Sequence, residues 1–200
     1  DIRHGDFKIS VDLENDSENL DAVLRKEYFS DLNRNIATMD GVRNVFTYAT
    51  LPAGFSTSND VADETLLMGY NEKDMDSLTT AIVSGNITEN TELIVSDPDR
   101  VYDVYHWKPQ IGDTVTFNLK NHSGKTITKT FKIGAITSSN DGMGGYIFRM
   151  PEKMMHELVG YDCTYAIEVQ TEPESIQEAE NKIRSLIAGN DEVSLQTLQD

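Results

Sequence analysis

The fold is decided by "IGDTVTFNL" at residues 111–119 together with "TITKTFKIGAI" at residues 126–136. Apolar and polar residues alternate along both segments, which is typical of strands with one buried face. The intervening "KNHSGK" at residues 120–125 has the Asn, Ser and Gly of a tight turn. The pair therefore predicts a β-hairpin, and no nucleophile, metal cage or phosphate loop lies beside it in the sequence.

Short elements surround this hairpin. Strands are predicted at "TLLMGY" (65–70), "ELIVS" (92–96) and "GGYIFRM" (144–150), and helices at 75–82, 97–107 and 151–159. Asp97 is the expected cap of the second helix, and Gly160 the expected stop of the third. We expect a small mixed unit with a curled sheet. Two stretches, "LPAGFSTSNDVADE" (51–64) and "TSSNDGMGG" (137–145), are predicted to be flexible connections.

Both ends of the chain have the order strand, helix, strand. Apolar periodicity predicts these elements at 7–13, 20–36 and 42–50, and again at 163–170, 174–187 and 192–198. Thr171 and Glu174 have the spacing of a capping box, with Pro173 in the first turn. Two such units indicate an α+β fold, a ferredoxin-like split βαβ layer with an inserted small mixed α/β lobe. The predicted domains are 1–52 plus 161–200, and 53–160.

Composition limits the classes of function. The chain has 34 acidic and 17 basic side chains, a formal charge of −17. Such a charge repels nucleic-acid phosphates and anionic lipid headgroups, so no nucleic-acid partner is expected. The apolar content of 38% fits a folded globular protein. Cys163 is the single cysteine and is expected to be buried. The absence of an initiator Met suggests a processed protein or a fragment.

No motif indicates chemistry. The histidines, His4, His106, His122 and His156, are scattered without metal-ligand spacing. "SDPDRVYD" lacks the glycine and distal Glu of a calcium loop. "NDGMGG" leads into a strand, whereas a phosphate loop leads into a helix. We therefore expect no catalytic residue, no metal and no cofactor.

Apolar residues inside the two predicted connections are candidate contacts for a partner. They are Leu51 and Phe55 in the first connection and Met143 in the second. Exposed apolar side chains on mobile loops often contact a protein or peptide. The alternative is that these side chains fold back onto the core.

The order of the segments resembles the extracytoplasmic (MacB-like periplasmic core) domain of FtsX-like ABC transporter permeases. The resemblance extends over essentially the whole chain. Its matching pieces are "GDFKISVD" (5–12), "GVRNVFTYA" (41–49), "ELIVSDPDRVYDVY" (92–105), "IGDTVTFNL" (111–119), "TFKIGAI" (130–136) and "YAIEVQTEPESIQEAENKIRSLI" (165–187).

The resemblance implies a domain placed between the first and second membrane helices of a permease, with lobes called porter and sabre. It implies a non-enzymatic role at the extracytoplasmic face of the cell membrane. A separate cytoplasmic subunit would hydrolyse ATP, and the domain would transmit that motion and contact a partner or a peptide-like substrate. The implied partners are the parent permease helices, and dimerisation is expected only in the full transporter. The sequence departs from the family because both flanking membrane segments are absent from it.

A second hypothesis is a stand-alone ligand- or protein-binding module with a ferredoxin-like core. A third is a hydrolase whose site is assembled from distant residues. Only the permease hypothesis predicts apolar segments of about 20 residues outside both ends. A hydrolase should gather polar groups and perturbed carboxylates in one cleft.

Overall fold

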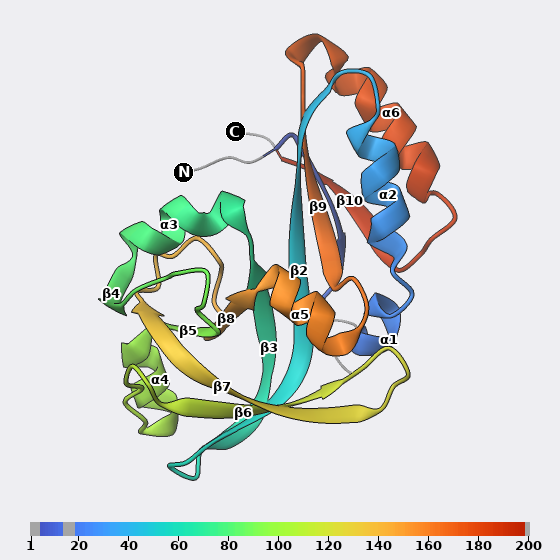
Figure 1. The fold of residues 1–200 in the computed structure, drawn as a ribbon. Coiled ribbons are helices and arrows are strands. Elements are labelled where there is room, and N and C mark those ends of the chain that lie inside the picture. Colours follow the sequence, from blue (N-terminus) through green and yellow to red (C-terminus); the bar gives the residue numbers. More distant parts are fainter. Residues whose placement is uncertain (1–4, 14–18, 199–200) are drawn as a thin grey trace. The chain divides into compact units, whose positions relative to one another are not determined.

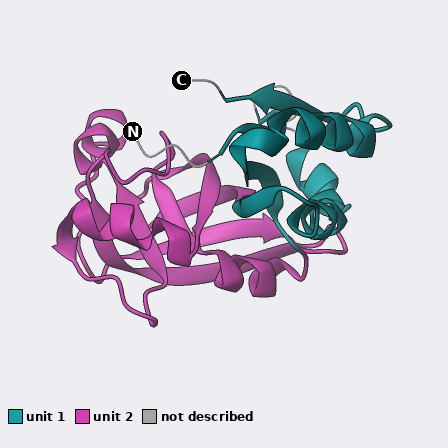
Figure 2. Ribbon diagram, turned by 90° about the horizontal axis from the view of Figure 1, so that it is seen from above, with its two compact units in different colours: residues 1–49, 162–200 teal, residues 50–161 magenta. Residues whose placement is uncertain are grey.

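The chain forms two compact units, shown in different colours in Figure 2. The structure is a computed structural model that describes residues 5–13 and 19–198. Unit 1 combines residues 1–49 with 162–200, and unit 2 is residues 50–161. Strand β2 (Val42–Thr57) contributes its first half to unit 1 and its second half to unit 2.

The described part of unit 1 is an antiparallel sheet with helices beside it. Its strands are β1 (Phe7–Val11), the first half of β2, β9 (Thr164–Thr171) and β10 (Val193–Thr197), in the order β10-β1-β9-β2. Its helical segments are α1 (Leu20–Leu24), α2 (Tyr28–Ala37), the 3₁₀ turn η2 (Pro173–Ser175) and α6 (Ile176–Ile187). Helices α2 and α6 lie next to each other (Figure 1). The strand–helix–strand order predicted at both ends is therefore confirmed.

Register explains why one face of this sheet is apolar. Ile9 on β1 lies opposite Ile167 on β9 and Leu195 on β10. The helices contribute their own buried stripes, which include Ile36 of α2 and Ile183 of α6, both fully buried. The apolar residues that alternate along the strands and the apolar stripes of the helices thus pack together in one core.

The capping box predicted at Thr171 and Glu174 is wrong. Thr171 is the last residue of β9 and precedes the N-cap position, and its hydroxyl donates to Asp6 Oδ2 at 3.0 Å. The turn η2 has Glu172 at its N-cap position, without a side-chain cap.

Unit 2 is a closed barrel. Its strands are the second half of β2, β3 (Ala62–Tyr70), β5 (Leu93–Ser96), β6 (Thr114–Lys120), β7 (Thr126–Thr137) and β8 (Phe148–Pro151). Neighbours pair in the ring β2-β3-β8-β5-β7-β6 and back to β2. Strand β4 (Ile82–Gly85) pairs with β7. The predicted fold class, a ferredoxin-like layer with a small inserted mixed lobe, is wrong because this six-stranded mixed barrel is a major part of the architecture.

The predicted connection at 51–64 is the source of the error. Strand β2 continues to Thr57 and β3 starts at Ala62, so only a short turn separates them. Pairing of β2 with β9 ends at Ala49, and pairing with β6 begins at Gly54. Pro52 lies between these two pairings, where its missing N–H interrupts neither ladder. A proline and a glycine that looked like loop signals are therefore strand residues.

Helices of unit 2 follow the predicted signals more closely. They are the 3₁₀ turn η1 (Glu72–Asp74), α3 (Met75–Thr80), α4 (Pro98–Tyr105) and α5 (Glu152–Val159). The cap at Asp97 is confirmed, since its side chain accepts from the Arg100 backbone N–H at 3.5 Å. Gly160 ends α5 at φ 81, as predicted. Ile82 was expected in the helix but begins β4.

Aromatic rings fill the barrel. The Phe148 ring lies 4.9 Å from the Phe55 ring and 5.1 Å from the Phe117 ring, centroid to centroid, in edge-to-face geometry. All three side chains are buried and come from β8, β2 and β6. The interior is a packed core, as expected for a small barrel.

Candidate functional site

The structure separates the predicted contact residues into two groups. Leu51 and Phe55 lie on strand β2 with 1% and 2% of their surfaces exposed. Their predicted placement on an exposed loop is wrong, because both are buried strand residues. Leu51 and Phe55 therefore follow the alternative interpretation, in which these side chains pack onto the core.

Met143 is placed differently. It lies in the segment between β7 and β8 and is half-buried. It packs, with Met75 and Ile87, against a buried cluster consisting of Tyr70, Leu78, Ile94 and Ala135. Three partly buried apolar side chains therefore cover this cluster, and the two methionines among them adapt readily to a bound group.

The segment that carries Met143 is held by a buried ion pair. Arg149 on β8 and Asp141 in the segment are both 0% exposed. Arg149 Nε donates to Asp141 Oδ2 at 3.0 Å, and Arg149 Nη2 donates to Asp141 Oδ1 at 3.3 Å. A bidentate pair of this kind is the strong form of the Arg–carboxylate interaction.

Further hydrogen bonds satisfy both charged groups. Asp141 also accepts from Thr137 Oγ1 at 2.9 Å and from the Met143 backbone N–H at 3.1 Å. Arg149 also donates to the carbonyl oxygens of Gly144, at 3.0 Å, and Tyr146. The segment predicted to be a flexible connection is thus fixed at several points. One feature of the sequence could have revealed this anchoring: Arg149 lies within the apolar stretch "YIFRM", and a cation in a buried strand requires a partner.

Neither a cluster of metal-ligating side chains nor a helix long and apolar enough to cross a membrane occurs within residues 5–13 and 19–198. His4 lies outside the described residues. Burial raises the pKa of Tyr70 to about 12. Burial, and then the hydrogen bond to Asp63, raise the pKa of Tyr105 to about 12. Neither phenol is poised for acid–base chemistry near neutral pH.

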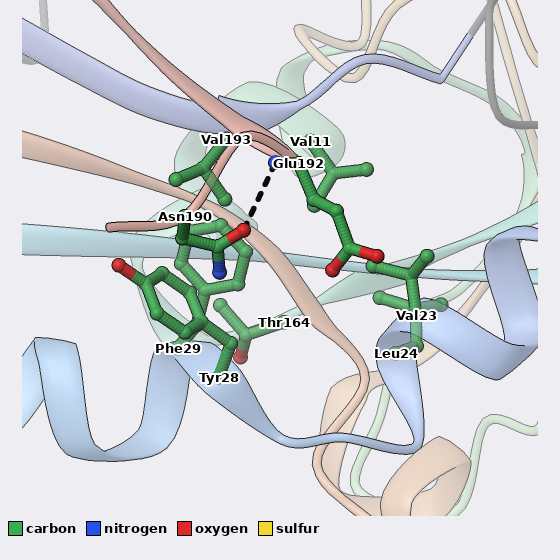
Figure 3. Close-up of a pocket in the computed structure, with 9 residues that line it drawn as sticks. All are labelled: Val11, Val23, Leu24, Tyr28, Phe29, Thr164, Asn190, Glu192 and Val193. Carbon is green, nitrogen blue, oxygen red and sulfur yellow. Dashed lines mark hydrogen bonds between the residues drawn. The ribbon is translucent and has the colours of Figure 1, made fainter. Parts of the chain in front are cut away.

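A small pocket lies in unit 1 (Figure 3). It is lined by Val11, Val23, Leu24, Tyr28, Phe29, Thr164, Asn190, Glu192 and Val193. Burial raises the pKa of Tyr28, and the Asn190 side chain partly offsets this. The space open to a water-sized sphere is about 10 Å³, which is about the volume that one water requires. The pocket is therefore too small for an organic ligand.

The two ends of unit 1 lie side by side. Strands β1 and β10 are antiparallel neighbours, and Phe7 near the start of the chain is opposite Thr197 near its end. The Leu198 backbone N–H donates to the Asp6 carbonyl at 2.8 Å. The described chain therefore enters and leaves unit 1 at the same place.

Comparison with known proteins finds similar structures but no match in sequence. No family model matches the sequence, and no curated protein matches it. The periplasmic region of MacB from Actinobacillus actinomycetemcomitans is similar, with a TM-score of 0.55 and 14% identity over 96% of this chain and 87% of that one.

The extracellular domain of the noncanonic ABC-type transporter YknZ from Gram-positive bacteria is also similar. Its TM-score is 0.51, with 17% identity over 85% of this chain and 88% of that one. At these identities the likeness concerns the fold, and it confirms the resemblance seen in the sequence. The chain has the fold of the periplasmic and extracellular domains of MacB-like ABC transporters.

Proposed function

We propose that the chain is the extracytoplasmic domain of an ABC transporter permease and has no enzymatic activity. In this role it transmits motion driven by ATP hydrolysis on a separate cytoplasmic subunit, and dimerises only within the full transporter. It contacts a partner or an exported or sensed peptide-like substrate. The fold likeness to transporter domains supports this proposal.

The observation that carries the proposal is the pairing of the two ends of unit 1. A domain inserted between consecutive membrane helices must leave the membrane and return to it close by. The hydrogen bond between Leu198 N and Asp6 O, at 2.8 Å, satisfies this requirement. Ladder pairing of β1 with β10 continues from Phe7–Thr197 to Val11–Val193, so the geometry is rigid.

Met143 is the proposed contact for the partner or substrate. Its thioether side chain is half-buried over the apolar cluster, and Asp141 accepts the Met143 backbone N–H. The backbone is therefore fixed while the unbranched side chain can rearrange. Such a surface suits a peptide with apolar side chains.

The first test reads the gene on both sides of the segment that encodes this chain. We expect apolar segments of about 20 residues immediately outside both ends, with further membrane spans downstream. A start codon directly upstream, or a stop codon directly after Asp200, would overturn the proposal in favour of a stand-alone binding module.

The contact is tested in the intact transporter with Met143→Gln, and Met154→Gln in α5 is the matched control. Both positions are half-buried in unit 2. We expect Met143→Gln to lower peptide-stimulated ATP hydrolysis while the basal rate stays unchanged. Equal behaviour of the two variants would remove Met143 from the proposed contact.

A further inference from the structure

A second surface of unit 2 lies outside the function proposed above: the outward face of the β6–β7 hairpin. Residues 114–140 contain no Asp or Glu, although the chain carries 34 acidic side chains among 200 residues. The same residues include four lysines, Lys120, Lys125, Lys129 and Lys132. A chain with a formal charge of −17 therefore concentrates positive charge on one hairpin.

The hairpin register gathers polar side chains on one face. The cross-strand pairs are Thr114–Lys132, Thr116–Thr130, Asn118–Thr128 and Lys120–Thr126. We call these eight residues the hydroxyl strip. All of them are exposed except Thr116, which is half-buried. The two ends of the strip, Thr114 and Lys120, are six positions apart along β6, which gives a length of about 20 Å.

The hydroxyl strip offers hydrogen-bond donors. The hydroxyls of Thr116 and Thr130 lie 2.8 Å apart, and the one that accepts keeps its own proton for another partner. Thr128 Oγ1 donates to Asn118 Oδ1 at 2.7 Å, which directs the amide oxygen inward along the strip and leaves the amide N–H groups to donate. With a lysine at each end, the strip favours an anionic ligand.

The strip is held in place at both ends. Strand β6 pairs with β2 from Gly54–Asn118 to Thr57–Val115. At the other end, the His122 backbone N–H donates to the Val159 carbonyl at the end of α5, at 2.8 Å. A fixed array of donors binds with little loss of conformational entropy.

We propose that the hydroxyl strip binds a linear phosphate polymer, such as a sugar- or polyol-phosphate chain. Threonine hydroxyls, amide N–H groups and lysines are common donors to phosphate oxygens. A membrane surface fits less well, because the strip presents no apolar side chain for insertion. A protein partner also fits less well, because the centre of a protein interface is normally apolar.

Among the described residues, Glu64, Glu92 and Asp113, which directly precedes Thr114, lie at the borders of the strip and should oppose an anion. Glu64 Oε1 lies beside Gly54, whose strand neighbour is Asn118. Glu92 Oε1 accepts the Lys132 backbone N–H at 3.1 Å. Removing the charge of Glu64 should therefore strengthen binding.

The test measures fluorescence anisotropy of labelled inorganic polyphosphate with the chain at about 0.15 M salt, where distant charges are screened. Lys120→Gln/Lys132→Gln should weaken binding about thirtyfold, because each lysine near a polyanion contributes a factor of about five. The control Lys108→Gln/Lys153→Gln removes the same charge elsewhere in unit 2 and should change affinity by less than about threefold. Thermal unfolding of each variant checks that the fold is intact.

Two further variants test the hydroxyls and the bordering charge. Thr116→Val/Thr130→Val keeps the β-branched shape and should weaken binding about tenfold, since a hydrogen bond to a charged group is lost. Glu64→Gln should tighten binding. Unchanged affinity in the lysine or threonine variant, or an equal loss in the control, would overturn the proposal.

Alternative ligands complete the test. Polyglutamate that binds as tightly as polyphosphate would refute phosphate recognition and indicate an acidic protein segment. Binding to phosphatidylglycerol vesicles without binding to polyphosphate would indicate a membrane surface instead. These outcomes do not depend on the flanking gene sequence, so this proposal and the permease proposal can fail separately.

Discussion

Replacing Asp141 with alanine should destabilise unit 2 severely. The variant leaves the Arg149 guanidinium fully buried without a countercharge, although the carbonyls of Gly144 and Tyr146 still accept from it. It also removes the acceptor for the Thr137 hydroxyl and the Met143 N–H. Removing one partner of a buried ion pair typically costs about 3–5 kcal/mol.

The loss is measurable by urea unfolding followed by circular dichroism. With a slope of about 2 kcal/mol per molar urea, a loss of about 4 kcal/mol lowers the midpoint by about 2 M. Asp103→Ala, at an exposed position on α4, is the matched control and should change stability by less than about 0.5 kcal/mol. A loss below about 1 kcal/mol for Asp141→Ala would show that the ion pair does not hold the segment, and would refute the reasoning.

Three other substitutions probe the barrel. Phe55→Ala should cost about 3–5 kcal/mol of unfolding free energy, because it opens a cavity beside Phe148, and a loss below about 1 kcal/mol would contradict the packed interior. Tyr70→Phe should leave stability equal or higher at neutral pH, since the Tyr70 hydroxyl finds no hydrogen-bond partner among the described residues. Because burial raises the pKa of Tyr70 to about 12, the unfolded state ionises first, and the wild type should lose up to about 3 kcal/mol of stability as the pH rises from 10 through 12; Tyr70→Phe should lack this loss in an unfolding series across that range. Gly160→Ala should cost about 1–2 kcal/mol in thermal unfolding, because φ is 81 and a Cβ would lie 2.8 Å from His122 Nδ1; an unchanged midpoint would argue against this turn being fixed.

Local signals in the sequence predicted the elements well. Alternation in the 111–136 segment correctly predicted the hairpin, and Asp97 and Gly160 correctly marked helix ends. These features depend on residues close in the chain, so one stretch of sequence contains the relevant interactions. The strand–helix–strand order at both ends was predicted for the same reason.

Closure of the barrel could not be predicted in this way. It depends on β2 reaching β6, which lies about 60 residues further along the chain. Buried and half-buried positions alternate along "LPAGFS" as in a strand. Pro52 and Gly54 are typical of loops, however, and they outweighed this alternation in the prediction. The candidate contacts Leu51 and Phe55 were misplaced by the same error. The anchor of the Met143 segment was also missed, because pairing of Asp141 with Arg149 is visible only when β8 is placed.

The adjacent ends of β1 and β10 also determine how unit 1 responds to mechanical force. When Phe7 and Thr197 are pulled apart, load falls first on the outermost hydrogen bonds of the antiparallel ladder. These bonds then break one after another, as in a zipper, and never share the load. Unit 1 is therefore weak against tension between its own ends. Pulling on these two ends therefore peels the edge strand β10 away and does not stretch unit 1 as a whole.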